Sequence, residues 1–336
     1  MTPYRYLQGR TVFLTGATGF IGSHLLDRLL EIGVREVRCL ARRPLPWHQS
    51  SDARIVRIAG DLTQASSWSS AMFGVDVVIH VAGRTAAKTP AELHEANVNG
   101  TVALLQAVRA QAPTVHRVIV ASSLAAVGKT ASGVADENAS LNPVSAYGAS
   151  KADMERALAA FSDLPITIVR PPAVYGPREE NIFLIIRAAN SGLFAATAPI
   201  DQPTMSLIHV DDLVEGMIQT LHSRAAQPLE TYFFDGPKHY TWSEIHASIR
   251  MALARRSMLI SLPRWTVMPV ATVSELLGRM VGKYPPLNRD KANEILYTST
   301  RCSDALARRA LNFQAKVTLE RGMKQTIAWY RAQEWI

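Results

Sequence analysis

Three glycines spaced three residues apart constrain the fold more than any other feature of the chain. They join the apolar run 11–15 to the amphipathic segment 20–32, in the sequence TVFLTGATGFIGSHLLDRLL. Glycines at a strand–helix junction permit a tight turn and close approach of the backbone to a pyrophosphate, and the helix N-terminus offers N–H groups to the phosphates. The sequence therefore predicts a dinucleotide-binding turn. Its predicted cofactor-binding residues are Gly16, Thr18, Gly19, Phe20, Ile21 and Gly22.

The first half of the chain alternates between strand-like and helix-like segments. Val/Ile-rich runs and amphipathic segments follow one another as strands at 37–41, 54–60, 75–83, 116–123 and 166–172, and as helices at 64–73, 91–111 and 147–161. Continuous apolar strands separated by helices indicate a parallel sheet buried on both faces. We therefore expect an α/β, doubly wound Rossmann fold with a smaller, mostly helical C-terminal substrate domain. The expected division assigns 1–175 with 205–235 to dinucleotide binding, and 176–204 with 236–336 to the substrate.

The charge of the chain argues against a nucleic-acid partner. Lys and Arg number 36 and Asp and Glu 28, and the excess of +8 is spread in short clusters without a basic arm. Such a balance is more typical of attraction to anionic small ligands or anionic lipid. Cys39 and Cys302 fit a reducing compartment, and no signal-peptide pattern is present, so we expect a cytoplasmic protein. The apolar stretch 258–278 contains Arg264, Glu275 and two prolines and is too interrupted to span a bilayer. The basic, apolar region 250–283 predicts at most peripheral membrane contact.

The end of the second predicted strand bears on cofactor preference. NAD sites commonly place an acidic residue about 20 positions beyond the glycines, to bind the ribose 2′-hydroxyl. Here the sequence CLARRP offers Arg42 and Arg43 instead, and an arginine fork pairs with a 2′-phosphate. We therefore predict that NADP(H) is favoured, with NAD(H) possible; the alternative is that both arginines only solvate a loop. Further residues predicted at the cofactor are Asp61 and Leu62 near the adenine, and Val81, Ala82 and Gly83 at the crevice.

A serine, a tyrosine and a lysine form the candidate catalytic group. Ser122 and Ser123 end the fifth predicted strand, at the edge where open α/β sheets bind ligands. Tyr147 and Lys151 lie one turn apart at a predicted helix start. A phenol titrates near about 10, and a neighbouring ammonium favours the phenolate, so we expect the pKa of Tyr147 to fall. We assign proton transfer to Tyr147, orientation of the substrate oxygen to Ser123, and both tuning and ribose binding to Lys151.

Motifs along most of the chain resemble those of extended short-chain dehydrogenases/reductases, the NAD(P)-dependent epimerase/dehydratase superfamily. They run in family order from Thr15 to Leu213, as TGATGFIG, GDLT, HVAG, NVNGT, SSLAAVG, YGASK, RPPAVYGP and IHVDDL. The resemblance is nearest to the 3β-hydroxysteroid dehydrogenase and dihydroflavonol reductase branch. It implies that Ser123, Tyr147 and Lys151 are catalytic and that Pro171 to Val174, including Ala173, line the nicotinamide pocket. It also implies a structural role for Asn97 and a homodimer.

Three positions depart from the sugar-modifying members that the chain resembles. Those dehydratases follow the catalytic hydroxyl with Asp-Glu, whereas Leu124 and Ala125 stand here and neither can move a proton. Met205 occupies the place of an arginine that binds the substrate diphosphate in epimerases. Arg178, Arg187 or Arg289 could substitute for it, which keeps a nucleotide-sugar epimerase open as an alternative. The segments 181–194 and 259–273 are apolar, as either core helices or a pocket for a hydrophobic substrate.

The sequence as a whole predicts an NADP(H)-dependent enzyme that interconverts a secondary alcohol and a ketone on an apolar small molecule. The alternatives are a nucleotide-sugar 4-epimerase with tightly bound NAD and a non-catalytic, redox-sensing dinucleotide-binding protein. No metal is expected: His80 is interpreted as a core residue, and HVDDL (209–213) as a helix start beside a core histidine. Trp329, Tyr330 and Trp335 are expected to seal the C-terminal helix.

Overall fold

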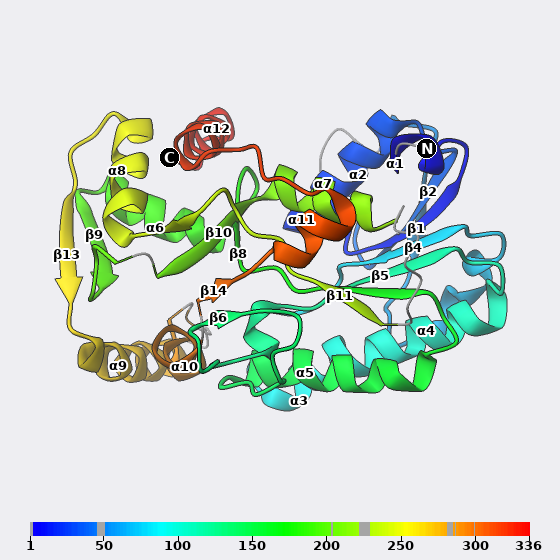
Figure 1. Ribbon diagram of the computed structural model, residues 1–336, viewed down its shortest axis with the longest axis horizontal. Coiled ribbons are helices and arrows are strands. Elements are labelled where there is room, and N and C mark those ends of the chain that lie inside the picture. The colour runs from blue at the N-terminus through cyan, green and yellow to red at the C-terminus, as the bar shows by residue number, and fades with distance from the viewer. Residues whose placement is uncertain are drawn as a thin grey trace.

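The computed structural model is built on a seven-stranded parallel sheet, shown in Figure 1. It describes residues 3–45, 51–202, 204–221, 229–280, 285, 287–298 and 300–336. The strand order is β11-β7-β5-β4-β1-β2-β3. The bounds are β1 Thr11–Thr15, β2 Glu36–Ala41, β3 Ile55–Ala59, β4 Val77–His80, β5 Arg117–Ala121, β7 Ile166–Val169 and β11 Glu230–Tyr232. The strand order reverses between β1 and β4, where Thr15 lies opposite His80, and ligands of such sheets bind at this point.

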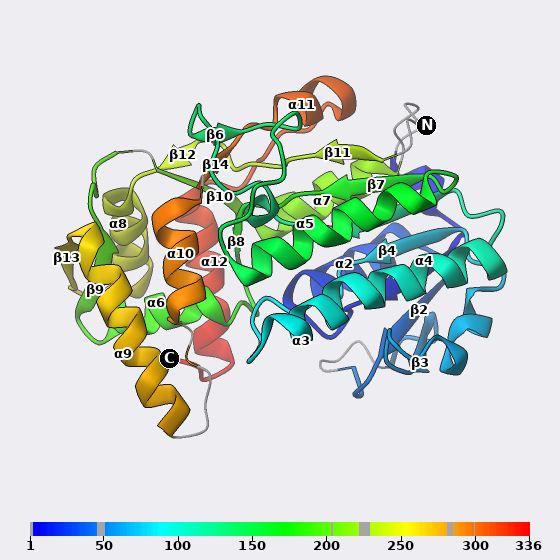
Figure 2. The ribbon, with the colours of Figure 1, turned by 90° about the horizontal axis from the view of Figure 1, so that it is seen from below.

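Helices cover both faces of the sheet, so the predicted doubly wound fold is confirmed (Figure 2). One face carries α1 Pro3–Leu7, α2 Phe20–Ile32, α7 Val210–Thr220 and α11 Ala305–Leu311. The other carries α4 Gly100–Gln111 and α5 Ala146–Leu158, with α3 Pro90–His94 packed on α5. A π-helical turn, Glu95–Asn99, joins α3 to α4, so the predicted helix 91–111 is continuous.

The α-helix predicted at 64–73 is wrong. Two short 3₁₀ turns, Ala65–Ser67 and Ser69–Met72, take its place. The Ser67 hydroxyl donates to the Gln64 carbonyl, and the Trp68 indole donates to the Asp61 carbonyl at 2.8 Å. Serine side chains that bond the nearby backbone compete with α-helix formation, and this segment has four of them. The result is a compact turn that packs Trp68 into the core.

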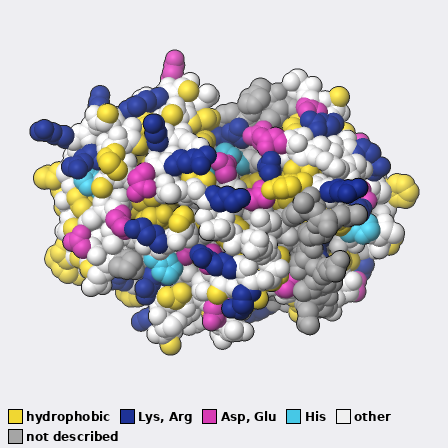
Figure 3. All heavy atoms as spheres, turned by 45° about the horizontal axis from the view of Figure 1, so that its top comes forward, with side chains coloured by type: hydrophobic (Ala, Val, Ile, Leu, Met, Phe, Trp, Pro, Cys, Tyr) yellow, Lys and Arg dark blue, Asp and Glu magenta, His cyan; other side chains and the backbone are white. Residues whose placement is uncertain are grey.

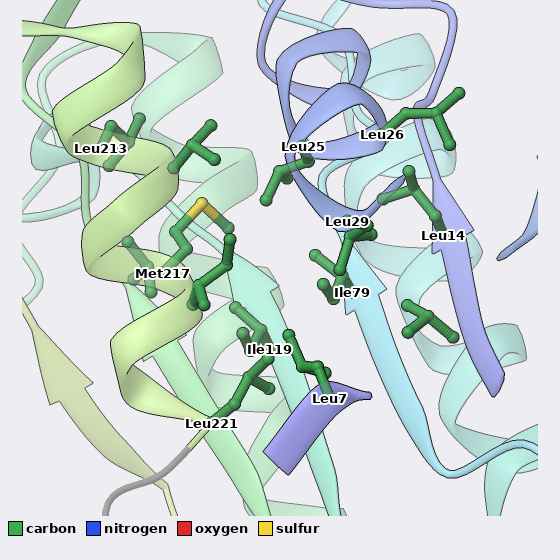
Figure 4. Packing of buried hydrophobic residues seen from close by; sticks show 14 of the residues in the cluster. Leu7, Leu14, Leu25, Leu26, Leu29, Ile79, Ile119, Leu213, Met217 and Leu221 are labelled. Carbon is green, nitrogen blue, oxygen red and sulfur yellow. The ribbon is translucent and has the colours of Figure 1, made fainter. Parts of the chain in front are cut away.

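Leucines and methionines from two helices form the larger core beneath the cofactor turn. Figure 4 shows Leu25 and Leu29 of α2 facing Leu213 and Met217 of α7, with Ile119 of β5 close by. All five are fully buried. Packing of this kind fixes the position of α2, and hence of the glycine turn at its start, relative to the sheet.

A second lobe packs beside the carboxyl edge of the sheet. Its helices are α6 Asn181–Asn190, α8 Trp242–Leu253, α9 Val267–Met280, α10 Arg289–Tyr297 and α12 Leu319–Ala332. Small sheets pair β8 Ala173–Tyr175 and β12 His239–Tyr240 with β10 Met205–His209, β9 Leu193–Thr197 with β13 Met258–Leu262, and β6 Val134–Ala135 with β14 Arg301–Cys302. Trp335 stacks on Tyr330 and contacts Trp329, which confirms the predicted seal on α12.

The surface shows no single dominant charge in the view of Figure 3. Lys and Arg side chains are interspersed there with Asp and Glu side chains, as the scattered charges of the sequence lead one to expect. Among the described residues, none of the helices combines the length and the apolar character needed to cross a bilayer.

The glycine turn generates a test of packing. A Cβ on Gly22 would lie 2.0 Å from the Gly16 carbonyl oxygen, which is backbone and cannot rotate away. We expect Gly22→Ala to lower the free energy of unfolding by about 1–3 kcal/mol, the usual range for overpacking. Chemical denaturation followed by circular dichroism measures it.

Gly100→Ala is the matched control, because Gly100 is also helical and its added Cβ would meet mainly the Leu62 side chain, at 3.3 Å. Helix propensity favours alanine equally at both positions. Equal stability changes in the two variants would contradict the steric account.

Candidate active site

The glycine turn lies against the end of β4. Gly16 has a φ of +79°, and the Gly19 amide donates to its carbonyl at 2.9 Å. A Cβ on Gly16 would lie 2.7 Å from the Ala82 amide nitrogen, so the turn and the predicted crevice residues Val81 to Gly83 are in direct contact. Gly19 caps α2 without a side-chain hydrogen bond, and Thr18 and Gly19 are exposed. The first N–H groups of α2 are thus placed to bind a phosphate.

The predicted adenine and 2′-phosphate residues lie together at the ends of β2 and β3. Arg42 Nη1 is 3.5 Å from Asp61 Oδ2, and the Arg42 side chain is 65% exposed. The amide and hydroxyl of Thr63 both donate to Asp61 Oδ1. Burial opposes ionisation of Asp61, but the bonds from Thr63 and the charge of Arg42 outweigh it and lower the pKa of the carboxyl. Arg43 is exposed beside this pair.

Ser123 lies just beyond the end of β5. It caps a 3₁₀ turn, Leu124–Ala126, and its hydroxyl accepts from the Ala125 amide at 3.1 Å. The Leu124 amide donates to the Pro171 carbonyl at 2.9 Å. The turn that carries Ser123 is therefore joined to the segment from Pro171 to Val174, which is predicted to line the nicotinamide pocket.

A close approach of α5 to the turn after Ser123 positions Tyr147, and the sequence analysis did not predict it. The hydroxyl of Ser145 caps α5 by accepting from the Gly148 amide at 2.9 Å. A Cβ on Gly148 would lie 2.4 Å from the Ala125 carbonyl oxygen, so only glycine lets α5 approach the turn after Ser123 this closely. The approach brings the Tyr147 hydroxyl into hydrogen-bonding contact with Ser123. Gly148, the glycine of YGASK, is the sequence feature that could have indicated this close approach.

The expected fall in the pKa of Tyr147 is wrong for this structure. Burial raises the pKa of Tyr147 to about 12; the bond with Ser123 opposes the rise and the Glu294 charge adds to it. Lys151 Nζ donates instead to the Ala121 carbonyl, at 2.8 Å, and does not offset the burial. Burial also lowers the pKa of Lys151 to about 8, against the opposing charge of Glu155. Lys151 nevertheless lies at the crevice, 3.4 Å from the position of a Cβ on Gly83.

A buried ion pair fixes α5 to the sheet. Glu155, one turn beyond Lys151, binds Arg170 with Nη2–Oε2 at 2.7 Å and Nε–Oε1 at 3.0 Å. The Ser122 hydroxyl donates to the same carboxylate, and all three residues are buried. Sequence reasoning missed this group, because pairing Glu155 with Arg170 requires knowing how α5 packs across the ends of β5 and β7.

Two acids of the second lobe hold the start of α5. The Asp290 carboxylate accepts from the Ala146 amide at 2.6 Å and from the Tyr147 amide at 3.4 Å. Glu294 accepts from the Ser145 hydroxyl at 2.9 Å. Negative charge at a helix N-terminus is stabilising, so α10 clamps the element that presents Tyr147. No local sequence signal predicts this contact, which joins residues 144 apart.

The residues interpreted as structural are confirmed in those roles. His80 is buried between the hydroxyls of Thr15 and Thr101, at 2.7 and 2.8 Å, and burial lowers its pKa to about 3. Asn97 accepts from the Arg84 amide and donates to the Ser150 hydroxyl, tying the π-helical turn to the end of β4 and to α5.

The residues of HVDDL serve the backbone. His209 accepts from the Asp211 amide at the start of α7, and the Asp212 carboxylate accepts from the amides of Lys316 and Val317. Within the described part of the chain, no three His, Cys, Asp or Glu side chains are grouped so as to hold a metal ion.

Known proteins match almost the whole chain. The family model described as the NAD dependent epimerase/dehydratase family matches residues 12–233. The ceramide reductase of Caulobacter vibrioides is 31% identical over 97% of this chain and 96% of its own length. The UDP-glucose 4-epimerase of Vibrio cholerae is 26% identical over 94% of each chain. The crystal structure of gox2253 superimposes with a TM-score of 0.78 at 26% identity, covering 97% of this chain and 99% of that one.

The contact between α10 and α5 predicts the effect of one charge on Tyr147. Because Glu294 raises the pKa of Tyr147, Glu294→Gln should lower that pKa while retaining a hydrogen bond to Ser145. Titration by ¹³C NMR of protein labelled at tyrosine Cζ measures the pKa, and Tyr147→Phe identifies the signal.

Asp153→Asn is the control, since Asp153 lies on the exposed side of α5 with its carboxylate on Arg156. It should leave the Tyr147 signal unchanged. A Tyr147 pKa that stays the same or rises in Glu294→Gln would refute the electrostatic role of α10.

Proposed function

This chain belongs to the NAD-dependent epimerase/dehydratase family and is an NAD(P)-dependent enzyme, and we propose that it is an NADP(H)-dependent reductase of an apolar, lipid-like ketone. The observation that carries the proposal is the contact between the Ser123 and Tyr147 hydroxyls, with Lys151 beside them at the carboxyl edge of the sheet. Reaction with a ketone needs an oriented carbonyl oxygen and a proton donor at that oxygen, and these three side chains supply both.

In the proposed mechanism the residues of the glycine turn would hold the dinucleotide, which would supply a hydride when bound. Ser123 donates a hydrogen bond to the substrate carbonyl oxygen and orients it. Tyr147 gives its proton to the same oxygen as the alcohol forms; a pKa of about 12 keeps the phenol protonated for this purpose at neutral pH. Lys151 binds ribose, and the nearby Glu155 carboxylate favours its charged form. In the reverse direction Tyr147 accepts the proton from the alcohol.

Preference for NADP(H) rests on Arg42 and Arg43, with NAD(H) as the weaker possibility. The Arg42–Asp61 contact is long, at 3.5 Å, and exposed. Exposed ion pairs contribute about 0–1 kcal/mol, so little opposes a turn of Arg42 towards a 2′-phosphate. Phosphate offers two or more charge-assisted bonds to an arginine fork.

An apolar substrate is supported by the uncharged residues at positions 124, 125 and 205 and by one relative. Leu124 and Ala125 follow Ser123, Met205 begins β10 opposite Tyr240, and none of the four carries a charge. The relative at 31% identity over nearly the whole chain is named a ceramide reductase, that is, an enzyme of a long-chain lipid. We propose a long-chain ketone as substrate, bound by a domain comprising 176–204 and 236–336. A homodimer and a cytoplasmic location are parts of the same proposal.

The second candidate is a nucleotide-sugar 4-epimerase with tightly bound NAD, which the Vibrio cholerae relative favours. The arginines considered as diphosphate anchors are already engaged. Arg178 binds Asp27 at 2.8 Å, Arg289 binds Glu275 at 3.2 Å, and Arg187 lies over the Phe183 ring. These contacts favour the reductase. Conversion of UDP- or GDP-sugars, with NAD retained through purification, would favour the epimerase. The intact serine, tyrosine and lysine argue against a non-catalytic sensor.

Replacing the proton donor tests the mechanism. Tyr147→Phe should reduce NADPH oxidation with a long-chain ketone by about 10²–10⁴-fold, the range for losing a general acid, while cofactor affinity stays nearly unchanged. Turnover is followed at the NADPH absorbance, against long-chain, steroid, aryl-ketone and nucleotide-sugar panels, and affinity by NADPH fluorescence. Tyr297→Phe, at an exposed tyrosine, is the control and should retain full activity. Retained turnover in Tyr147→Phe would overturn the assignment.

Replacing the arginine at the end of β2 tests cofactor preference. Arg42→Ala should raise the KM for NADPH by about tenfold, the loss of one charge-assisted hydrogen bond, and leave the KM for NADH nearly unchanged. Arg309→Ala, at an exposed residue of α11, should change neither. A wild-type protein with higher kcat/KM for NADH than for NADPH would contradict the preference.

A further inference from the structure

One side of α9 presents large apolar residues to solvent. We call it the α9 outer face and define it as Trp265, in the turn before the helix, with Val270, Val273, Leu276 and Leu277. Their exposed fractions are 76, 50, 57, 61 and 57%. The spacing of three and four residues places the four helical ones on one side. A contiguous apolar surface of this kind is typical of a binding surface.

The opposite side of α9 is already satisfied by packing on α10. Val267 and Ala271 are buried against Ala292, with Ile295 beside them. The helix is therefore apolar on two sides, one of which has its partner within the chain. Figures 1 and 2 both show α9 and α10 next to each other, with α9 at the periphery of the second lobe. Because the outward apolar side of this peripheral helix would otherwise contact water, we expect a partner outside the chain to cover it.

The exposed charged residues around the α9 outer face are basic. Among α9 side chains that the structure describes, residues 267–278, Glu275 is the one charged group, and it is buried and bound to Arg289. Arg264, just before the helix, is exposed, and so are Arg289 and Lys291 at the start of α10. Of the nearby acids, Asp290 and Glu294 face the start of α5, and Glu294 also binds Lys291 Nζ at 2.7 Å. The solvent side thus combines apolar residues with basic neighbours.

We infer that the α9 outer face docks on the surface of a membrane that contains anionic phospholipids. Apolar residues and a tryptophan suit the boundary between headgroups and acyl chains, and nearby Arg and Lys suit anionic headgroups. A second copy of the chain fits less well, because a self-complementary contact would bring Arg264, Arg289 and Lys291 of both copies together, while Glu275 and Glu294 are already bound within each copy. A bilayer surface offers both the apolar layer and the negative charge.

Docking at this face would link the membrane to the active site through the pair of helices α9 and α10. α10 packs on α9 and, through Asp290 and Glu294, holds the start of α5 that carries Tyr147. A lipid ketone held in the bilayer would then lie beside the helix pair that borders the site. This consequence rests on the proposed function, whereas the docking itself rests on the surface alone.

Vesicle binding by the full chain tests the inference. Co-sedimentation is measured with phosphatidylcholine vesicles with and without phosphatidylglycerol, at low and high salt. We expect binding to the anionic vesicles that weakens with salt, and a loss of about tenfold or more in Val273→Glu/Leu277→Glu. Phe73→Glu is the matched control, because Phe73 is 75% exposed but lies before β4, in the other part of the molecule. It should bind as the wild type does.

A labelling experiment keeps the test valid if the double variant folds poorly. Both native cysteines are buried, so Val273→Cys and Phe73→Cys can each be labelled with a polarity-sensitive fluorophore. We expect a blue shift with anionic vesicles at position 273 and none at 73.

Three results would overturn the inference. The first is no vesicle binding by the wild type, and the second is equal binding by the folded double variant. The third is a wild-type dimer in light scattering that becomes a monomer in the double variant, without vesicle binding. Vesicle binding without ketone reduction would overturn the proposed function and leave the docking surface intact.

Discussion

The buried ion pair between Glu155 and Arg170 is the interaction on which the candidate site depends. It joins α5 to the end of β7, and the Ser122 hydroxyl adds the end of β5 to the same carboxylate. Removing one partner of a buried pair typically costs about 3–5 kcal/mol, because the other charge is left without compensation. Glu155 lies one turn beyond Lys151, so the pair also sets where Lys151 Nζ and the Tyr147 hydroxyl lie relative to the strand ends. The contact of Gly148 with the Ala125 carbonyl then completes the approach.

The electrostatics of the site favour proton donation by Tyr147. Its pKa of about 12 leaves the phenol protonated across the neutral range, and the Ser123 hydroxyl is in contact with it. Lys151, with a pKa of about 8, is close enough to neutrality for small changes in its surroundings to alter its charge. The two values arise from burial, which disfavours the charged form of each group, so exclusion of water governs both.

Features that depend on local pattern could be predicted from the sequence, and features that depend on register and long-range packing could not. The glycine turn and the Val/Ile-rich strands each carry a local signal, and the structure has them where the sequence placed them. The helix predicted at 147–161 is α5, which begins one residue earlier and ends at Leu158. The helix predicted at 64–73 was wrong because serine side chains there bond the nearby backbone, as Ser67 does. The predicted fall in the pKa of Tyr147 was wrong for another reason. The spacing of Tyr147 and Lys151 is visible in the sequence, but their burial and the hydrogen bond from Lys151 to the Ala121 carbonyl are not. Likewise, the apolar sequence of α9 could not reveal which of its sides packs on α10.

The central claim is that a hydride passes from a dissociable NADPH to the carbonyl carbon of an apolar ketone. The most direct measurement is mass spectrometry of the alcohol formed from a long-chain ketone with NADPH deuterated at nicotinamide C4. We expect one deuterium at the carbinol carbon with the cofactor deuterated on one face and none with the other, and transfer slowed by about 10²–10⁴-fold in Tyr147→Phe. Absence of deuterium from the product with both labelled cofactors, or label-free interconversion of nucleotide-sugar epimers, would contradict it.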